Sequence, residues 1–388
     1  MSENGVYGLV CSGGGARGSY QVGVLKYIHE HFCKDSRSPF QIFTGASCGS
    51  LNTSFYAAQS YDAQKSRLWL EDLWMHFDVP AYHGSVFKNM VKSFYQRWKN
   101  RKRKEDPAVW SLLSAGPMKD IIKKGFSREN LEKSFKLGST LGAGIAATEM
   151  LSGRCCWFQE GAKASDWNLF HSLGMKTYLQ AHHMEASCSV PIFLPPVKIG
   201  NHYFTDGSVG MDRPLAAAII MGATRILTIA TDQPSPTQLP VYPDYFRPKV
   251  SNIVRLLLNR LSRDLTRDEG IEIAMLNRFY YAMSRRKKNH GRNEEFPLFH
   301  EQALPSHYHP VSLFAFYPSR GIRDYFGLDA KGKGQKSQRT RFLFHAKFIA
   351  ELIELGYQDA KSRHDELRKF FIPEVQSRWF FHPEKKSA

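Results

Sequence analysis

The sequence predicts an α/β protein whose central sheet is layered with helices. Near the amino terminus, an apolar run over residues 6–11 is followed by a glycine-rich loop and then by a helical pattern. Further along, a helical pattern over residues 214–221 precedes a β-branched apolar run over residues 225–231. Because strands that alternate with helices are typical of a sheet covered by helices, these two segments indicate this fold class.

The loop after the first expected strand, residues 12–18, is rich in glycine. The helical pattern behind it places four apolar side chains on one face: Val22, Leu25, Ile28 and Phe32. A strand, a glycine loop and a helix in this order direct free backbone N–H groups at an anion, either a nucleotide phosphate or the oxyanion of an acyl-transfer intermediate. The loop lacks the Gly-Lys-Ser/Thr end of a P-loop, but Gly13-x-Gly15-x-x-Gly18 satisfies the dinucleotide-binding pattern, so both interpretations stay open at this point.

The next strand and helix are joined by a run that matches Gly-x-Ser-x-Gly, the pattern of a nucleophile elbow, with Ser47 between Gly45 and Gly49. Residues 40–44 before it are typical of a buried strand, and residues 51–58 after it can continue as a helix. Glycine is needed on both sides because a side chain there would collide with the adjoining strand or helix. The pattern therefore predicts a serine hydroxyl lifted out of the fold.

A carboxylate follows much later in the chain, in the dipeptide Asp206-Gly207. A short hairpin that turns at Gly200-Asn201 precedes it, and an Asp-Gly flanked by apolar residues is itself usually a turn. A serine hydroxyl needs a neighbouring base to become a nucleophile. We therefore also consider Asp206 as a partner for Ser47.

Together, four segments resemble the signatures of the patatin-like phospholipases. They are the glycine loop Gly13-Gly14-Gly15-Ala16-Arg17-Gly18, the elbow Gly45-Ala46-Ser47-Cys48-Gly49, the stretch Ala186-Ser187-Cys188-Ser189-Val190-Pro191 and the dipeptide Asp206-Gly207. They occur in the family's order, and no signature residue is missing. The resemblance covers residues 5–232, which we expect to form a catalytic domain.

The resemblance implies a three-layer patatin-like fold with a mostly parallel central sheet, and hydrolysis of lipid acyl esters of the phospholipase A or lysophospholipase type, with release of free fatty acid. It assigns Ser47 as the nucleophile and Asp206 as the general base of a dyad without a catalytic histidine. The glycine loop would supply the oxyanion hole: Gly13, Gly14, Gly15 and, at its end, Arg17. Such a dyad needs no metal or other cofactor, so we expect hydrolysis to be unaffected by EDTA.

The charge of the chain points to an anionic partner. The net charge is +17 and the pI about 9.5, which favours a membrane surface, a nucleic acid or an acidic protein. We expect an anionic phospholipid surface and no nucleic acid, because no nucleic-acid-binding motif accompanies the basic residues. The sequence leaves an unknown activator open. With no secretory signal in residues 1–10 and six cysteines that lack Cys-x-x-Cys spacing, we expect a cytoplasmic protein that is peripheral at membranes.

Residues 87–98 form a basic amphipathic pattern with aromatic residues on one face, directly before a basic run over residues 97–104. This combination is typical of a helix that lies in a membrane interface or forms a lid, although a core-packed helix followed by a solvated loop is the alternative. The pair His182-His183 invites a metal interpretation, but no third ligand stands at a suitable spacing.

The resemblance fades beyond residue 232, and we expect residues 233–388 to form a mainly helical C-terminal extension. Residues 253–283 predict one or two helices, which end in the basic cluster 285–288, and residues 340–370 predict a last helix. Residues 289–337 are mostly polar. The extension can act as a lid, a regulatory region or a membrane contact, or it can simply pack on the core.

Two other functions are weighed against a lipid acyl hydrolase. The first is a Ser–Asp–His esterase acting on small esters, which would need a histidine after Asp206, such as His345 or His307. That class usually places its elbow after several strands, whereas one strand and one helix precede the elbow strand here. The second is a non-enzymatic basic protein that binds a nucleotide or nucleic acid through the glycine loop.

Overall fold

The computed structural model describes residues 5–33, 37–76, 111, 115–169, 171–233, 265–290, 309–320 and 346–372, with the backbone alone for residues 282–290. The strands are β1 (Tyr7–Cys11), β2 (Ile42–Ala46), β3 (Gly142–Glu149), β4 (Cys155–Glu160), β5 (Trp167–Asn168), β6 (Ser172–Lys176), β7 (Val197–Ile199), β8 (His202–Asp206), β9 (Arg225–Ile229) and β10 (Ser312–Phe316). The helices are η1 (Gly15–Gly18), α1 (Ser19–Phe32), α2 (Cys48–Ala58), α3 (Ala63–Met75), α6 (Gly116–Gly125), α7 (Arg128–Lys136), α8 (Ala181–Ser187), α9 (Ala216–Ile220), α11 (Thr266–His290), α12 (Ala346–Ser362) and α13 (His364–Phe371).

Within the described residues, all the strands belong to one sheet, in the order β10-β9-β1-β2-β3-β4-β6-β5, while β8 pairs with β3 and β7 pairs with β8. The strands from β10 to β3 run parallel to one another, and β8 joins β3 antiparallel. Strands β1 and β2 are buried at every position. Such uniform burial is expected for parallel strands that are covered on both faces.

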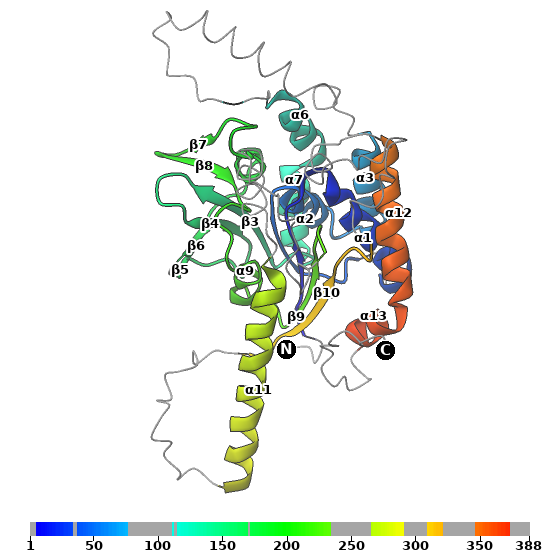
Figure 1. The fold of residues 1–388 in the computed structure, drawn as a ribbon, viewed down its shortest axis with the longest axis vertical. Helices are drawn as coiled ribbons and strands as arrows, with labels where there is room; N and C mark the ends of the chain where they lie inside the picture. The colour runs from blue at the N-terminus through cyan, green and yellow to red at the C-terminus, as the bar shows by residue number, and fades with distance from the viewer. Residues whose placement is uncertain are drawn as a thin grey trace, which may run out of the picture.

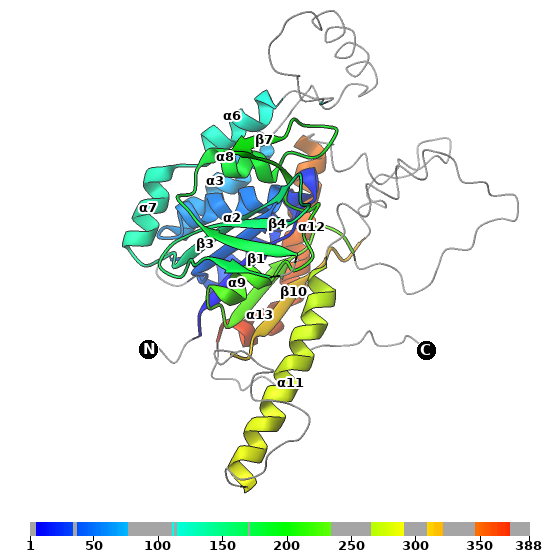
Figure 2. The same cartoon turned by 90° about the vertical axis from the view of Figure 1, so that its left-hand side faces the viewer.

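Two hydrophobic cores lie on opposite faces of the sheet, and Figures 1 and 2 show the helices that cover them. Helices α1, α2 and α12 lie on one face, while α9 and the first turns of α11 lie on the other. Successive side chains of β1 point to opposite faces of the sheet, so Leu9 packs in the first core and Val10 in the second. The result is a three-layer α/β arrangement with a mostly parallel sheet, as the sequence predicts.

The last part of the chain packs directly against the first helix. A Cβ added at Gly23 of α1 would lie 1.9 Å from the carbonyl oxygen of Ile353 in α12, so only glycine allows the two helices to approach this closely. The hydroxyl of Tyr20 donates to Oδ2 of the buried Asp359 at 3.0 Å. Helix α12 is therefore part of the layer that covers the sheet.

The described part of the C-terminal extension is largely helical, as predicted, but it also contributes a strand that the sequence analysis did not expect. Strand β10 pairs parallel with β9 at one edge of the sheet. The predicted helices correspond to α11, α12 and α13, and the basic cluster 285–288 lies on the last turns of α11. The expected amphipathic helix over residues 87–98 and the basic run over residues 97–104 lie outside the described residues.

Three further observations bear on the predictions. All six cysteines are free thiols. Among the described residues, no group of three or more His, Cys, Asp or Glu side chains could hold a metal ion. In the same part of the chain, every helix is either too short or too polar to cross a bilayer.

The buried carboxylate of Glu269 joins α11 to the start of α9. One of its oxygens accepts a hydrogen bond from the backbone N–H of Leu215 at 2.6 Å. Burial raises the pKa of Glu269 from 4.5 to about 7, against the opposing effects of the Leu215 N–H and Arg213, and the neighbouring carboxylates of Glu272 and Asp212 raise it further. The folded protein therefore holds a proton on this side chain at pH values where the unfolded chain has already released it.

We expect Glu269 to make the free energy of unfolding pH-dependent. The folded pKa is raised, so its stabilising contribution is complete below pH 4.5 and is lost as the pH rises through about 7, in total about 3 kcal/mol. Glu269→Gln keeps an acceptor for the Leu215 N–H but cannot ionise. Urea unfolding at pH 5 and pH 8 should show a smaller loss of stability in this variant than in wild type. Glu272→Gln, at a half-exposed position, is the control, and equal pH slopes in wild type and Glu269→Gln would contradict the assignment.

Candidate active site

The nucleophile elbow lies between β2 and α2, with Ser47 at its tip. Its backbone has φ 52° and ψ −130°, a strained conformation that few residues other than glycine adopt. A Cβ added at Gly45 would lie 2.4 Å from the carbonyl oxygen of Gly49, and one added at Gly49 would lie 2.2 Å from that of Cys11. The two glycines therefore allow the sharp turn, and the strain is concentrated at the predicted nucleophile.

The side chains of Ser47 and Asp206 are in direct contact. The hydroxyl Oγ of Ser47 donates a hydrogen bond to Oδ2 of Asp206 at 2.6 Å, across 159 positions of sequence. Both residues are almost fully buried, with 4 % and 3 % of their surface exposed. The sequence analysis named both residues, and the fold brings them together because β2 and β8 both neighbour β3 in the sheet.

The carboxylate of Asp206 is fixed by contacts that leave Oδ2 directed at Ser47. Its other oxygen, Oδ1, accepts the backbone N–H of Ser208 at 2.8 Å. The backbone N–H of Asp206 donates to the carbonyl oxygen of Ser189 at 2.9 Å, and its carbonyl oxygen accepts the hydroxyl of Thr148 at 2.7 Å. The carboxylate is thus held in one orientation.

The glycine loop is held by side chains from elsewhere in the chain. The hydroxyl of Thr231 donates to the carbonyl oxygen of Gly13 at 2.6 Å. The buried guanidinium of Arg17 forms an ion pair with Asp232, and the backbone N–H of Arg17 donates to the carbonyl oxygen of Gly14 at 3.3 Å. These contacts of Arg17 stabilise the loop. The oxyanion hole formed by Gly13, Gly14 and Gly15 stays a prediction.

Comparison with known protein families gives one match: the model described as patatin-like phospholipase matches residues 9–219, which is more than half of the chain. The chain belongs to the patatin-like phospholipase family. Both halves of the patatin-like site lie inside the matched range, because the elbow and Asp206 fall between residues 9 and 219. No curated protein sequence matches the chain.

Solved structures with a similar arrangement include VipD from Legionella pneumophila, with 13 % sequence identity and a TM-score of 0.36; the match covers 93 % of this chain and 67 % of VipD. Human GIVD cytosolic phospholipase A2, in complex with methyl gamma-linolenyl fluorophosphonate, has 11 % identity and TM-scores of 0.44 and 0.43 in two structures. The match covers 95 % of this chain but 59 % of the human enzyme, which is less than two thirds of its length.

The fourth patatin-like segment, at the end of α8, links Ser47 to the segment that carries Asp206. The hydroxyl oxygen of Ser187 accepts the backbone N–H of Ser47 at 2.9 Å. The carbonyl oxygen of Ser187 accepts the backbone N–H of Gly207, the neighbour of Asp206, at 3.1 Å. The resemblance located this segment but assigned no role to Ser187, because a hydrogen bond between distant segments leaves no local pattern.

Two buried cysteines near Ser47 and Asp206 keep their thiols protonated. Burial raises the pKa of the Cys188 thiol well above its usual value, and the neighbouring Asp206 and Cys48 raise it further. Burial also raises the pKa of Cys11 in the same direction. Since the thiolate is the reactive form, these two side chains stay unreactive thiols at neutral pH.

Among the histidines that the sequence analysis considered, only His182 and His183 lie within the described residues. His183 Nδ1 accepts the backbone N–H of Gln180 at 3.0 Å, so its ring caps α8. Burial lowers the pKa of His183 to about 3, and the adjacent His182 lowers it further. His307 and His345, the histidines that a Ser–Asp–His triad could use, lie outside the described residues.

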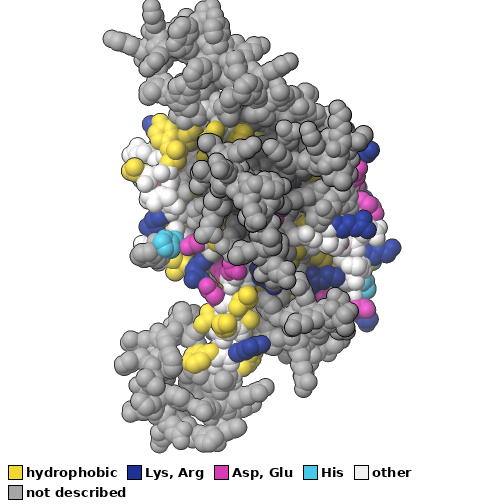
Figure 3. Space-filling model, viewed as in Figure 1, with side chains coloured by type: hydrophobic (Ala, Val, Ile, Leu, Met, Phe, Trp, Pro, Cys, Tyr) yellow, Lys and Arg dark blue, Asp and Glu magenta, His cyan; other side chains and the backbone are white. Residues whose placement is uncertain are grey.

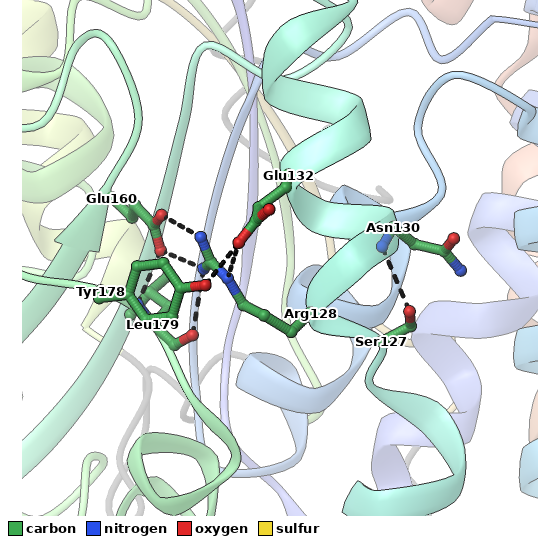
Figure 4. A network of polar contacts seen from close by, with 7 residues as sticks. All are labelled: Ser127, Arg128, Asn130, Glu132, Glu160, Tyr178 and Leu179. Carbon is green, nitrogen blue, oxygen red and sulfur yellow. Dashed lines mark hydrogen bonds and ion pairs between the residues drawn. The ribbon is translucent and has the colours of Figure 1, made fainter.

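A polar network around Arg128 anchors the segment that leads into α8 (Figure 4). The guanidinium of Arg128 donates to both carboxylate oxygens of Glu160, at 2.5 and 2.6 Å, and lies 3.4 Å from the ring centre of Tyr178. Glu160 also accepts the backbone N–H of Leu179 at 2.7 Å. The start of α7, the end of β4 and the approach to α8 are therefore held together, upstream of the Ser187 contact with the elbow.

We expect Arg128→Lys to lower the free energy of unfolding by about 1–3 kcal/mol, because lysine cannot reproduce the two-pronged bond to Glu160 or stack on Tyr178. Urea unfolding monitored by circular dichroism would measure this. Arg213→Lys is the control, since Arg213 pairs with Glu272 at positions that are about half exposed and should contribute less than about 1 kcal/mol. Equal losses in the two variants would show that the network contributes no more than a surface ion pair.

Proposed function

We propose that this chain is a serine-dependent lipid acyl hydrolase that cleaves the carboxylic ester bonds of membrane phospholipids and releases free fatty acid. The observation that carries the proposal is the 2.6 Å hydrogen bond from Ser47 Oγ to Asp206 Oδ2 at a strained elbow, in a chain of the patatin-like phospholipase family. A serine paired directly with a carboxylate is an activated nucleophile.

In the acylation step, Asp206 takes the hydroxyl proton of Ser47 while Oγ attacks the carbonyl carbon of the ester. The negative charge that develops on the carbonyl oxygen would be stabilised by backbone N–H groups of Gly13, Gly14 and Gly15. Each such donor is typically worth about 3–4 kcal/mol in the transition state. Asp206 then returns the proton to the leaving alcohol, and the acyl group remains bonded to Ser47.

In the second step, water releases the acyl group as a fatty acid. The water oxygen attacks the acyl carbonyl carbon while Asp206 takes a proton from the water. Asp206 then gives this proton to Ser47 Oγ as the bond between Oγ and the acyl carbon breaks. Its fixed orientation supports this double use, because Ser208 and Ser189 hold the carboxylate and the backbone in one position. Metal ions take no part in this sequence of steps, so we propose a hydrolase without a cofactor.

We propose that a cavity beside Ser189 receives part of the acyl chain. Its volume is about 230 Å³, and its lining combines apolar side chains, among them Met118, Leu194 and Val197, with the charged side chains of Lys119, Glu185 and Lys198. Ser189 also lines it, and the carbonyl oxygen of Ser189 binds the backbone N–H of Asp206. A chain in this cavity would therefore lie close to the base of the dyad.

We propose that the phospholipid surface is reached from the side of the molecule where β7 and β8 project. Hydrophobic side chains gather there in Figure 3. Ile192 is 61 % exposed and has a φ of 73°, an unusual conformation for a β-branched residue, and Tyr203 and Lys198 are also exposed. Apolar side chains beside lysine suit an anionic membrane surface, and the net charge of +17 supports the same partner. The proposal therefore includes a location at the membrane periphery, on the cytoplasmic side.

The proposal is tested by the release of fatty acid from phospholipid vesicles. Wild-type protein should release fatty acid, faster from vesicles that contain an anionic phospholipid than from purely zwitterionic ones. Ile192→Ser should weaken vesicle binding in a flotation assay while leaving the hydrolysis of a soluble p-nitrophenyl ester unchanged. Failure to release fatty acid from any phospholipid, or to cleave the soluble ester, would overturn the proposed activity.

A further inference from the structure

A second, smaller cavity of about 30 Å³ lies where the glycine loop, the elbow and the segment after Asp206 meet. Residues from all three line it, among them Ser12, Gly13, Ala46 and Ser208, and Trp157 of β4 lines it from the sheet. This is about the space that two water molecules need, since one needs about 10–15 Å³.

Three polar atoms of the residues that line this cavity are buried and have no hydrogen-bond partner among the described residues. They are the hydroxyl oxygens of Ser12 and Ser208 and the indole Nε1 of Trp157, whose side chain is almost fully buried. Leaving a buried donor or acceptor unpaired costs about 1–3 kcal/mol for each group, so such atoms are normally satisfied by the protein or by ordered water. They belong to three different elements, and the residues that carry them line one cavity.

The chemistry of this set identifies its ligand. An indole N–H only donates, whereas each hydroxyl can donate or accept, so a water molecule can accept from Trp157 and exchange hydrogen bonds with both serines. Two to four polar partners are what a buried water requires. The set contains no carboxylate for a cation and no positive charge for an anion. We propose that the cavity is a water site and that it supplies the water consumed when the acyl-enzyme is hydrolysed.

The position of Ser208 connects this water site to the reacting atoms. Its backbone N–H binds the carboxylate of Asp206, while its hydroxyl faces the glycine loop. A Cβ added at Gly13 would lie 2.2 Å from the hydroxyl oxygen of Ser208 and 3.0 Å from Cβ of Ser47, so both side chains lie close to Gly13, which lines the cavity. Ser208 therefore joins the cavity, which it lines, to the Asp206 carboxylate, which it binds.

The water would be used in the hydrolysis of the acyl-enzyme, which is the second step of the proposed function. This inference rests on that proposed function. The water oxygen forms a bond to the acyl carbon while Asp206 takes one of its protons. The bond between the acyl carbon and Ser47 Oγ then breaks, and the proton passes from Asp206 to Oγ. The products are a carboxylic acid and the free serine, so no further reactant is needed. Ser12, Ser208 and Trp157 act as positioning residues in this step.

The test compares water with an alcohol as acceptor of the acyl group. With p-nitrophenyl octanoate and added 1-butanol, the acyl-enzyme gives octanoic acid or butyl octanoate, and butanol is too large for a 30 Å³ cavity. Removing one hydrogen bond to the stored water should slow hydrolysis about fivefold without slowing butanolysis. Ser208→Ala and Trp157→Phe should therefore each raise the ratio of ester to acid about fivefold. This ratio does not depend on how much of the protein is folded or on the rate of acylation.

Trp167→Phe is the matched control, because Trp167 lies on β5 away from this cavity and its indole N–H already binds Gln159. Its product ratio should equal that of wild type. Unchanged ratios in both Ser208→Ala and Trp157→Phe would overturn the role in hydrolysis. A crystal structure of the wild-type protein should show an ordered water bonded to Ser208, Ser12 and Trp157, and an empty cavity would overturn the site itself. Failure of the proposed function would look different, since wild type would then release no p-nitrophenol.

Discussion

Replacement of Ser47 by alanine is expected to abolish ester hydrolysis, with a fall in kcat of at least about 10⁴-fold, because loss of the nucleophile leaves only substrate binding and the oxyanion donors. The fold should persist. The elbow is fixed by Gly45 and Gly49, and the backbone N–H of residue 47 still binds Ser187. Fatty-acid release from vesicles and cleavage of a soluble p-nitrophenyl ester measure the loss, and thermal unfolding measures the fold.

Ser54→Ala is the control for this variant, since Ser54 is a buried serine two turns further along α2. It should keep near-wild-type activity and a similar melting temperature. In Ser47→Ala, Asp206 loses one hydrogen bond but keeps the one from the Ser208 N–H, so we expect a loss of stability of only about 1 kcal/mol. Activity in Ser47→Ala within tenfold of wild type would rule out Ser47 as the nucleophile.

The sequence could predict the parts of the site that are formed by a few consecutive residues. The glycine loop and the elbow each occupy a few consecutive residues between an apolar strand and an amphipathic helix, so spacing alone indicates their shape. Asp206 lacks such a pattern, because Asp-Gly is usually just a turn. The family resemblance paired it with Ser47, and the geometry of β8 beside β3 supplies the physical reason that they meet.

The parts that the sequence could not predict depend on contacts between distant segments. Ser187 and Ser208 are ordinary serines in sequence, and only the folded structure places one against the Ser47 N–H and the other against the Asp206 carboxylate. Strand β10 is a run of five residues inside a mostly polar region, which is too short to stand out from its surroundings. Its pairing with β9 joins the sheet to a segment far beyond residue 232.

Replacement of Asp206 by asparagine is expected to lower kcat by at least about 10³-fold while leaving the structure unchanged. Asparagine has the same shape, so an amide oxygen can still accept the Ser208 N–H, but the amide group that then faces Ser47 Oγ cannot take its proton. Stability should be equal or slightly higher, because the variant removes a charge from a nearly fully buried position. The pre-steady-state release of p-nitrophenol measures acylation, and urea unfolding measures stability.

Asp166→Asn makes the same chemical change at an exposed turn, where the side chain accepts the Lys176 N–H, and it should leave turnover intact. The Asp206 variant alone does not separate a dyad from a Ser–Asp–His triad, because loss of the carboxylate is severe in either mechanism. His307→Gln and His345→Gln make that separation. If both histidine variants turn over at the wild-type rate while Asp206→Asn does not, the proton of Ser47 passes directly to Asp206, as the 2.6 Å contact between them predicts. A loss of about 10³-fold or more in either histidine variant would instead place an imidazole in the mechanism and reduce Asp206 to an orienting role.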